Sequence, residues 1–303
     1  MKGTVTRSGL LLIDKPEGPS SALIVSRIKK ILGARKVGHL GTLDPFASGL
    51  LLLGINEGTK VADIFLGAVK SYHAVMVLGV ETDSQDATGN ILTVHPAPAV
   101  CDSDLVALEK KFTGDLQQVP PMFSALKKDG VRLYRLARQG KEVARESRSI
   151  RVEKLCLRRL NDTELGFDVT CSRGTYVRTL AADMGKHLGC GAHLKSLRRT
   201  ACGHLTVKQA MSINEIEELD AKAELPLIPL HAALSHLRAV TWPDQFLSRL
   251  RLGQQEILGQ IDKPSAGEQL ISIQDSRGGV VALARWGEEV PGGGWRLLRV
   301  FHG

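Results

Sequence analysis

The stretch VGHLGTLDPFASGLLLLGINEGTK, residues 37–60, is the most informative part of this chain. Its first half is rich in glycine and shows no hydrophobic periodicity, which predicts a loop. Its second half contains the apolar run Leu50 to Leu53, which is typical of a short buried strand. The stretch therefore predicts an irregular loop that leads directly into the core, and such a loop needs a functional explanation.

Asp44 is the candidate reactive group in this loop. It lies among three glycines and precedes Pro45, which pushes Asp44 toward extended conformations and has no amide hydrogen. The carboxylate would then be held on a stiff bend that a ligand can approach closely. On local sequence alone, however, an Asp-Pro pair favours the start of a helix. Arg178 is the complementary candidate because a guanidinium favours the charged form of a nearby carboxylate, although an arginine beside a helix is normally a surface residue.

The segments on both sides of this stretch predict an α+β fold. Gly9 to Asp14 is expected to form a buried strand, and Ser20 is a suitable N-cap for a helix that ends at Gly33. Further along the chain, the patterns predict helices capped by Thr59, over Asp104 to Phe112 and from Val177 to Gly189, and strands over Ser71 to Val80, Ile150 to Leu157 and Leu165 to Cys171, the last two as a hairpin.

The composition excludes several classes of protein. With 303 residues, 43% of them hydrophobic, the chain has room for about two domains and is too apolar for a largely disordered protein. No uncharged apolar run approaches the roughly 18 residues of a membrane span, and the N-terminal MKGTVTRSG lacks the apolar core of a signal peptide. We therefore expect a cytoplasmic protein. Five cysteines without a CxxC pair argue against a disulfide framework.

Positive charge is concentrated in one segment. The chain has 40 Lys and Arg against 32 Asp and Glu, but residues 127–159 alone contain 12 basic and four acidic residues. A concentrated excess of this kind favours a polyanionic partner such as nucleic acid, and a solvated surface is an equally good interpretation of the charge alone. Arg132, Arg135 and Arg138 recur every three residues and would line one flank of a surface helix.

The C-terminal part differs from the rest. The composition changes near Ala239 to Gln245, and short β-like runs at Gln269 to Ile273, Val280 to Trp286 and Trp295 to Phe301 are separated by DSRGG and PGGG. We therefore expect two domains, residues 1–240 and a small β-rich module at residues 241–303.

Sequence motifs give no support for a metal or a nucleotide cofactor. The candidate zinc ligands straddle a predicted helix end and lack a paired knuckle spacing, so we reject the set His187, Cys190, His193, Cys202 and His204. The GxxG at residues 38–41 is a weak match to RNA-binding loops. The chain contains neither a P-loop nor a dinucleotide fingerprint.

Four motifs together resemble the TruB family of tRNA pseudouridine synthases. They are the opening stretch at residues 37–60, KSYHAVMVLGVETDSQDATG at 70–89, PPMFSALKKDGVRLYRLARQG at 120–140 and CSRGTYVRTLAADMGKHLGCGAHLKSLRRT at 171–200. The likeness covers nearly everything from Gly9 to Thr200 in order. The C-terminal module is similar in position and length to the family's PUA domain.

The resemblance implies a fold and an activity. The fold would be an α+β pseudouridine synthase domain on a mixed, mainly antiparallel sheet with flanking helices. A basic thumb would be inserted at about residues 120–150, and a PUA-like RNA-binding domain would follow. The activity would be isomerisation of uridine to pseudouridine at position 55 in the T loop of tRNA. We expect no cofactor, no metal, no membrane and a monomer whose partner is the tRNA T stem-loop.

The resemblance also implies roles for particular residues. The catalytic set would be an aspartate, the arginine that pairs with it and a tyrosine that stacks under the base, here Asp44, Arg178 and Tyr72. Tyr176 and Leu197 would line the pocket, and His39 would support the extruded conformation of the T loop. Lys15 and Pro16 would belong to an N-terminal motif with a mainly structural role. In the thumb, Arg132, Arg135 and Arg138 would bind the RNA.

Three routes and two other functions remain open on sequence alone. Asp44 would attack C1′ of the ribose, attack C6 of the base, or assist elimination to a glycal. A different function within the enzyme class is a guide-dependent relative that modifies ribosomal RNA with partner proteins. A function of another class is an RNA-binding or RNA-folding protein in which catalysis is incidental.

Overall fold

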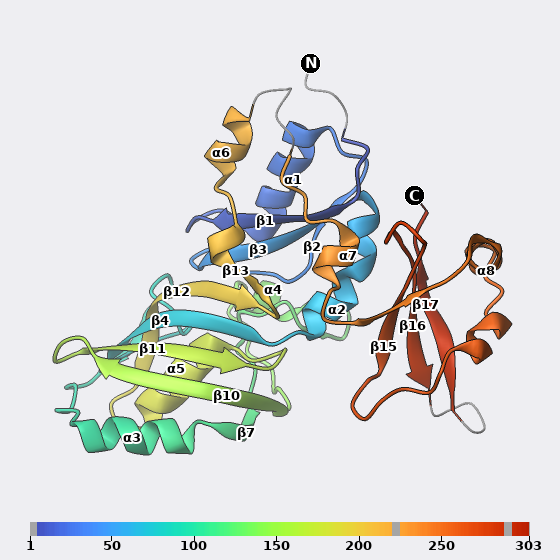
Figure 1. Cartoon of the computed structure of the whole chain (residues 1–303). Coiled ribbons are helices and arrows are strands. Elements are labelled where there is room, and N and C mark those ends of the chain that lie inside the picture. Colours follow the sequence, from blue (N-terminus) through green and yellow to red (C-terminus); the bar gives the residue numbers. More distant parts are fainter. Residues whose placement is uncertain (1–4, 220–224, 288–292, 303) are drawn as a thin grey trace.

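A mixed sheet forms the centre of the larger domain in the computed structural model, which describes residues 5–219, 225–287 and 293–302 (Figure 1). Within these residues the sheet has nine strands in the order β1-β3-β12-β4-β11-β10-β7, with β2 beside β3 and β13 beside β12. The strands are β1 (Gly9–Lys15), β2 (Val37–His39), β3 (Ser48–Ile55), β4 (Lys70–Leu78), β7 (Gly114–Gln118), β10 (Arg148–Arg159), β11 (Glu164–Cys171), β12 (Ala192–Cys202) and β13 (Leu205–Thr206). Among these strands only β12 and β3 pair in parallel, so the predicted mixed, mainly antiparallel sheet is confirmed.

β1 and β3 are apolar along most of their length because both faces of this part of the sheet are covered. They pair antiparallel, with Leu11 opposite Leu53. Successive side chains point to opposite faces, so Leu11 and Leu53 join the main core, whereas Leu10 and Leu12 join a second core on the other face. The predicted strands at Gly9 to Asp14 and Leu50 to Leu53 are confirmed, and the loop that carries Asp44 leads directly into β3 and the core.

Three helices cover one face of the sheet. They are α1 (Ser21–Leu32), α3 (Asp102–Lys111) and α5 (Val177–His187), and Figure 1 shows α5 behind β11 and β10 with α3 along the sheet edge. Leu108 of α3 and Met184 of α5 pack in the same core as Phe167 of β11. The predictions of these three helices and of the β10–β11 hairpin are confirmed.

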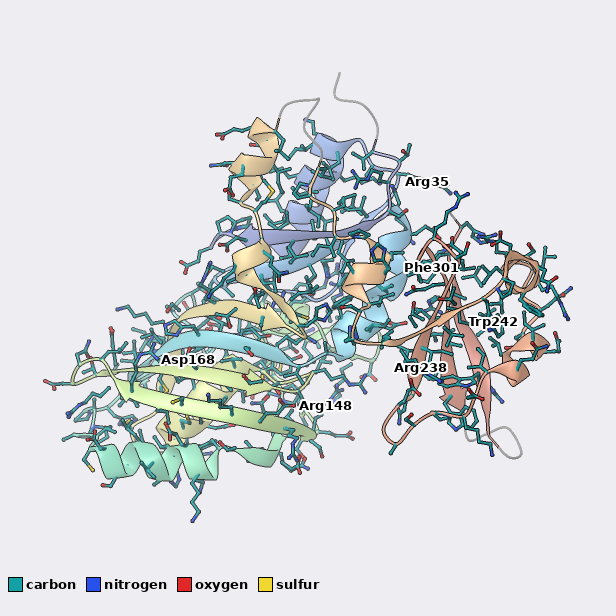
Figure 2. The ribbon with its side chains drawn as sticks, viewed as in Figure 1. Arg35, Arg148, Asp168, Arg238, Trp242 and Phe301 are labelled. Atoms are coloured by element: carbon teal, nitrogen blue, oxygen red, sulfur yellow. The ribbon has the colours of Figure 1, made fainter. Side chains whose placement is uncertain are left out.

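The C-terminal β-rich domain is also confirmed. It contains a four-stranded sheet in the order β14-β15-β16-β17, built from β14 (Arg238–Thr241), β15 (Leu270–Gln274), β16 (Val280–Gly287) and β17 (Gly294–Val300), with α8 (Asp244–Arg251) beside it. Leu283 and Phe301 of this domain pack against Val61 and Phe65 of the larger domain. Figure 2 shows Phe301 where the two domains meet.

The remaining elements are short. They are η1 (Asn56–Val61), α2 (Ala62–Gly67), β5 (Val80–Thr82), β6 (Ile91–Val94), β8 (Lys127–Lys128), β9 (Val131–Arg132), α4 (Leu133–Ala137), η2 (Val207–Gln209), α6 (Ile213–Glu218), α7 (Leu230–Ala233) and η3 (Glu256–Gln260). The prediction that Thr59 caps a helix is wrong. Thr59 lies inside η1, where its hydroxyl donates to the Asn56 carbonyl at 2.9 Å, and α2 begins after Val61.

The basic segment leaves the sheet between β7 and β10. We call residues 119–147 the thumb segment; it contains β8, β9 and the five-residue helix α4. Arg132, Arg135 and Arg138 are exposed, whereas Leu133 is buried. The arginines therefore lie at the surface as the three-residue spacing predicted, although the helix is only about one turn long.

Two further properties bear on the chemistry. None of the helices in the described part of the chain is both long enough and apolar enough to cross a membrane. All five cysteines are free thiols, and Cys171, Cys190 and Cys202 are buried.

The N-cap of α1 gives a test of this fold. Ser20 Oγ accepts a hydrogen bond from the Leu23 amide at 3.2 Å and satisfies one of the unpaired donors at the helix start. We expect Ser20→Ala to lower the free energy of unfolding by about 1 kcal/mol. The exposed Ser26 in the same helix is the control, because Ser26→Ala removes a hydroxyl without removing a cap. Equal effects of the two changes in urea titrations would contradict the assignment.

Candidate active site

Asp44 lies on a β-turn between β2 and β3. The Ala47 amide donates to the Asp44 carbonyl at 3.1 Å, so Pro45 occupies the second turn position, which suits its fixed φ. The preceding Leu43 is fixed by Ser21 Oγ, which bonds both its carbonyl and its amide at 2.9 Å. The local expectation of a helix start at Asp44 is therefore wrong. The chain enters β3 shortly afterwards at Ser48, and strand pairing prevents a helix there.

A close approach of two strands holds the end of this loop. Gly49 of β3 has φ +97°, and a Cβ there would lie 2.3 Å from the Arg199 carbonyl of β12. Only glycine fits this position without strain. The parallel contact between β3 and β12 therefore depends on Gly49, and this contact places the loop that carries Asp44 beside β12.

Arg178 holds the Asp44 carboxylate. Its Nε lies 2.9 Å from Asp44 Oδ2, and the arginine side chain is only 4% exposed against 39% for Asp44. The guanidinium also donates to the carbonyls of Ser84 at 2.7 Å and Phe123 at 2.9 Å. No group of the described residues donates a hydrogen bond to Asp44 Oδ1. One carboxylate oxygen is thus fixed, and the other is available to a substrate.

Asp86 is a second carboxylate at Arg178. Its Oδ2 lies 3.6 Å from Arg178 Nη1, and its side chain is 6% exposed. Oδ1 accepts from the Ser84 hydroxyl at 2.7 Å and from the Thr88 hydroxyl and amide. A buried arginine needs such compensation, and Asp86 adds a second negative charge to that of Asp44.

Tyr72 and Arg199 meet in adjacent strands, β4 and β12. Burial raises the pKa of Tyr72 to about 12, while a hydrogen bond to Arg199 acts in the opposite direction. Arg199 is 3% exposed and also donates to the carbonyls of Leu50 at 2.7 Å, Gly41 at 3.2 Å and Thr42 at 3.3 Å. Arg199 therefore connects the tyrosine to the loop that carries Asp44.

Lys15 supports the same loop from β1. Its side chain is fully buried, and Nζ donates to the carbonyls of Pro16 at 2.8 Å, Pro19 at 2.9 Å and Pro45 at 3.2 Å. Burial lowers the pKa of Lys15 to about 8, and the nearby Asp44 carboxylate opposes this shift. The bond to Pro45 fixes the residue next to Asp44, which agrees with a structural role for Lys15 and Pro16.

The other predicted pocket residues lie around this centre. Tyr176 precedes Arg178 by two residues; burial raises the pKa of its hydroxyl and Asp44 adds to the increase. Leu197 is buried in β12. His39 lies in β2 with its Nδ1 buried and without a hydrogen-bond partner among the described residues. Burial and Arg199 lower the pKa of His39, which favours a neutral ring.

The thumb arginines form a separate group. Arg138 lies over the Tyr134 ring at 5.7 Å, and hydrogen bonds from Arg135 and then Arg132 lower the pKa of the Tyr134 hydroxyl. The Tyr134 amide donates to the Ser124 carbonyl at 3.1 Å, and Ser124 follows Phe123, whose carbonyl accepts from Arg178 at 2.9 Å.

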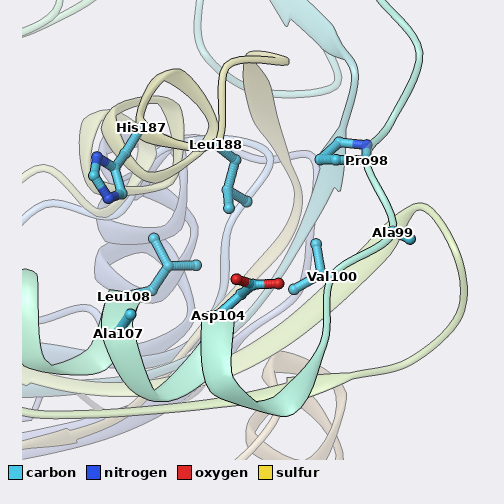
Figure 3. Close-up of a pocket in the computed structure, with 8 residues that line it drawn as sticks. All are labelled: Pro98, Ala99, Val100, Asp104, Ala107, Leu108, His187 and Leu188. Carbon is cyan, nitrogen blue, oxygen red and sulfur yellow. The ribbon is translucent and has the colours of Figure 1, made fainter.

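Other candidate sites were sought among the described residues. In residues 5–219, 225–287 and 293–302 no group of three or more His, Cys, Asp or Glu is arranged to hold a metal ion. A cavity of about 330 Å³ lies at the opposite end of α5 from Arg178 (Figure 3). It is lined by Pro98, Ala99, Val100, Asp104, Ala107, Leu108, His187 and Leu188. Asp104 is already bonded to the Cys101 amide at 2.9 Å as part of a helix cap.

Comparison with known proteins identifies the family. A model described as "TruB family pseudouridylate synthase (N terminal domain)" matches residues 29–177, and one described as "tRNA pseudouridylate synthase B C-terminal domain" matches residues 178–238. The chain belongs to the TruB family. The resemblance seen in the sequence motifs is therefore confirmed, and the chain is an enzyme of the pseudouridine synthase class.

Relatives extend over nearly the whole chain. The tRNA pseudouridine synthase B of Geobacter sulfurreducens is 40% identical over 306 residues, 97% of this chain and 99% of that protein. The protein of the same name from Nitrosococcus oceani is 44% identical over 81% of each chain. A chain in the crystal structure of a Cbf5-Nop10-Gar1 complex is 26% identical, with a TM-score of 0.75 over 97% of this chain and 85% of that one.

Asp86, Arg199 and Gln118 were missed by the sequence analysis. The TDSQDATG segment around Asp86 belongs to one of the motifs of the resemblance, but Asp86 itself was given no role. Arg199 and Leu197 are two residues apart in β12, so their side chains point to the same face of the sheet, and both are buried. A charged residue on the buried face of a strand is unusual, and the alternation of Leu197 and Arg199 was visible in the sequence. Gln118 is buried at 3% exposure and bonds the backbone of Tyr176.

The buried Lys15 gives a pH-dependent test. Because its pKa is lowered from 10.5 to about 8, the folded protein loses this proton at lower pH than the unfolded chain. The contribution of Lys15 to the free energy of unfolding should therefore rise between about pH 8 and 10.5, by at most about 1.4 kcal/mol per pH unit, and should be constant below that window.

Urea unfolding of wild type, Lys15→Met and the exposed control Lys30→Met at about pH 7.5 to 10 measures this slope. Lys15→Met should lose the rise, and Lys30→Met should keep it. Parallel slopes in all three proteins would show that Lys15 titrates normally in the folded state.

Proposed function

We propose that this enzyme isomerises uridine to pseudouridine at position 55 in the T loop of tRNA, with Asp44 as the reacting carboxylate. The observation that carries the proposal is the partly exposed Asp44, whose Oδ2 is fixed at 2.9 Å by the buried Arg178 while Oδ1 accepts no hydrogen bond from the described residues. Relatives named tRNA pseudouridine synthase B over almost the full length support the choice of RNA.

The reaction needs few groups. The bond between N1 and C1′ must break, the uracil must rotate, and C5 must bond to C1′ before the C5 proton leaves. A carboxylate in direct-attack routes must be ionised, and the charge of Arg178 stabilises that form. The same carboxylate serves attack at C1′, attack at C6 or elimination to a glycal, so all three routes use the observed geometry.

Tyr72 is assigned to base stacking. A uridine inside a folded RNA is inaccessible and must be flipped out, and stacking on an aromatic ring returns about 1 to 3 kcal/mol of that cost. A phenol with a pKa of about 12 is mostly protonated at neutral pH and is therefore a poor base. Its neutral hydroxyl, held by Arg199, orients the ring, and the neutral His39 would support the extruded nucleotide.

RNA binding is assigned to two parts of the chain. The thumb segment presents Arg132, Arg135 and Arg138 at the surface, where each can neutralise a phosphate. The C-terminal domain, which the sequence places at residues 241–303 and whose sheet begins with β14 at Arg238, would be the PUA-like second contact. The catalytic domain, placed at residues 1–240 by the sequence, would then end slightly earlier, just before β14.

A guide-dependent activity is the alternative. The structural neighbour from a Cbf5-Nop10-Gar1 complex supports it at 26% identity. The relatives named tRNA pseudouridine synthase B, at 40% and 44% identity, favour stand-alone action. Pseudouridine formation by the purified chain on a bare T stem-loop, without guide RNA or partner proteins, distinguishes the two.

The role of Asp44 is tested by Asp44→Asn. We expect the single-turnover rate on a T stem-loop transcript to fall by more than about 10³-fold, as for removal of a reacting group, with pseudouridine mapped at single-nucleotide resolution. Asp168→Asn is the matched control, because Asp168 is also an exposed partner of an arginine, Arg158, at 2.9 Å. Product from Asp44→Asn at the wild-type rate would assign the chemistry to another group.

The role of the thumb arginines is tested by changing all three to alanine. Binding of tRNA should weaken, and the slope of log K against log salt should become shallower by about 0.9 for each duplex phosphate that the variant no longer neutralises. Single-turnover chemistry at saturating RNA should remain measurable. Lys110→Ala with Lys111→Ala, two basic residues at the end of α3, should leave the slope unchanged. An unchanged slope in the arginine variant would refute the assignment.

A further inference from the structure

Gln118 holds both main-chain polar groups of Tyr176. Its Oε1 accepts from the Tyr176 amide at 2.8 Å, and its Nε2 donates to the Tyr176 carbonyl at 3.1 Å. The side chain is 3% exposed, so water does not compete for these bonds. A buried carboxamide that satisfies a donor and an acceptor of one residue fixes that residue in position and orientation.

Tyr176 is the point at which α5 begins. It is the N-cap of the helix with φ −95° and ψ 105°, and no side chain caps this end. Its carbonyl also accepts the first intrahelical bond, from Leu180 at 3.0 Å. Arg178 follows two residues later, within the same first turn. The two hydrogen bonds from Gln118 to Tyr176 therefore fix the start of the helix from which the Arg178 guanidinium reaches Asp44.

Gln118 is also the base of the thumb segment. It is the last residue of β7, and it lies opposite Arg148, the first residue of β10, so both ends of the thumb segment meet at this pair. Figure 2 shows Arg148 at the end of the sheet. From within the thumb segment the Phe123 carbonyl accepts from Arg178 at 2.9 Å. The start of α5 and the start of the thumb segment are thus joined at one buried side chain.

We propose that Gln118 is a positioning residue for pseudouridine formation, which fixes the first turn of α5 to the base of the thumb segment and so keeps the Arg178 guanidinium on Asp44. The inference rests on the proposed function. Gln118 acts through Tyr176 and Arg178 and needs no contact with a substrate atom. Its removal should therefore reduce the rate of the bound complex and leave RNA affinity largely intact, because a small misplacement of a catalytic group is costly to rate.

The experiment compares Gln118→Met and Gln118→Glu with the control Gln117→Met. Gln117 is the exposed neighbour in β7, and its amide donates to the Ser149 hydroxyl at 2.8 Å. We expect the single-turnover rate of Gln118→Met at saturating T stem-loop to fall by about 10²-fold, with the dissociation constant for that RNA changed less than about threefold. Gln117→Met should match wild type in both quantities.

The pH dependence of the rate of Gln118→Glu is a second test, because a purely structural role of Gln118 would not change this pH dependence. An ionised carboxylate accepts from the Tyr176 amide but repels the Tyr176 carbonyl, whereas a protonated carboxyl donates to it as the amide does. The charged groups that act on the adjacent Tyr176 hydroxyl are Asp44, Arg148 and Arg178. Between about pH 8 and 5, the rate of Gln118→Glu relative to wild type should rise as pH falls, because a buried carboxyl takes up its proton in this range.

The outcomes separate the inference from the function. Wild type without pseudouridine product contradicts the proposed function, whereas product from wild type with an equal rate from Gln118→Met overturns only this inference. A defect confined to RNA affinity, or a pH profile of Gln118→Glu parallel to that of wild type, overturns it as well. Thermal unfolding of both variants completes the test, because unfolding of both at assay temperature would overturn the positioning role and assign Gln118 to global stability.

Discussion

The site depends on a guanidinium that is almost completely removed from water. Arg178 is 4% exposed and always charged, so its burial is tolerated only if oxygen atoms surround it. Asp44, Asp86 and the carbonyls of Ser84 and Phe123 provide them. These partners and the arginine come from four separate stretches of chain, which means that the ion pair forms only when the loop before β3, the turn after β5, the thumb base and α5 are all in place.

A second buried guanidinium, that of Arg199, lies beside Tyr72 as that of Arg178 lies beside Asp44. Arg199 extends from β12 to the carbonyls of Gly41 and Thr42, just before Asp44, and it lies opposite Tyr72 in the adjacent strand. The loop that carries Asp44 forms no regular strand or helix at residues 40–47. Side chains must therefore donate hydrogen bonds to its buried carbonyls. Arg199 and Lys15 do so from two strands, and this makes an irregular loop rigid enough to present a carboxylate.

The hydrophobic pattern of the sequence was enough to predict several strands and helices. The leucine run of β3, the hairpin of β10 and β11 and the capped helix α1 all follow from periodicity and end signals. Prediction failed at the Asp44 turn, where the pairing of β3 overrides the local preference for a helix start, and at Thr59, which lies inside η1 and not at the start of a helix. Within the site, Asp44 was indicated by its proline and glycines. Its contact with Arg178 joins segments far apart in the chain, so the residues alone made Arg178 a candidate partner, and the family resemblance implied the pairing. Asp86 and Gln118 gave no such signal, because a buried polar side chain is recognised by the groups it satisfies, and those groups belong largely to other segments.

The position of Asp44 also bears on whether RNA binding or chemistry shaped this surface. A carboxylate near a basic arm repels phosphate, so a protein that only bound RNA would do better with a neutral residue there. Burying Arg178 behind Asp44 adds a desolvation cost that a binding surface does not need. Both costs are understandable if the carboxylate must be ionised, oriented and open on one oxygen when a flipped nucleoside arrives. The geometry at Arg178 therefore favours the proposed enzyme, in which the Asp44–Arg178 pair would act in the reaction and the thumb segment and the C-terminal domain would supply the RNA affinity.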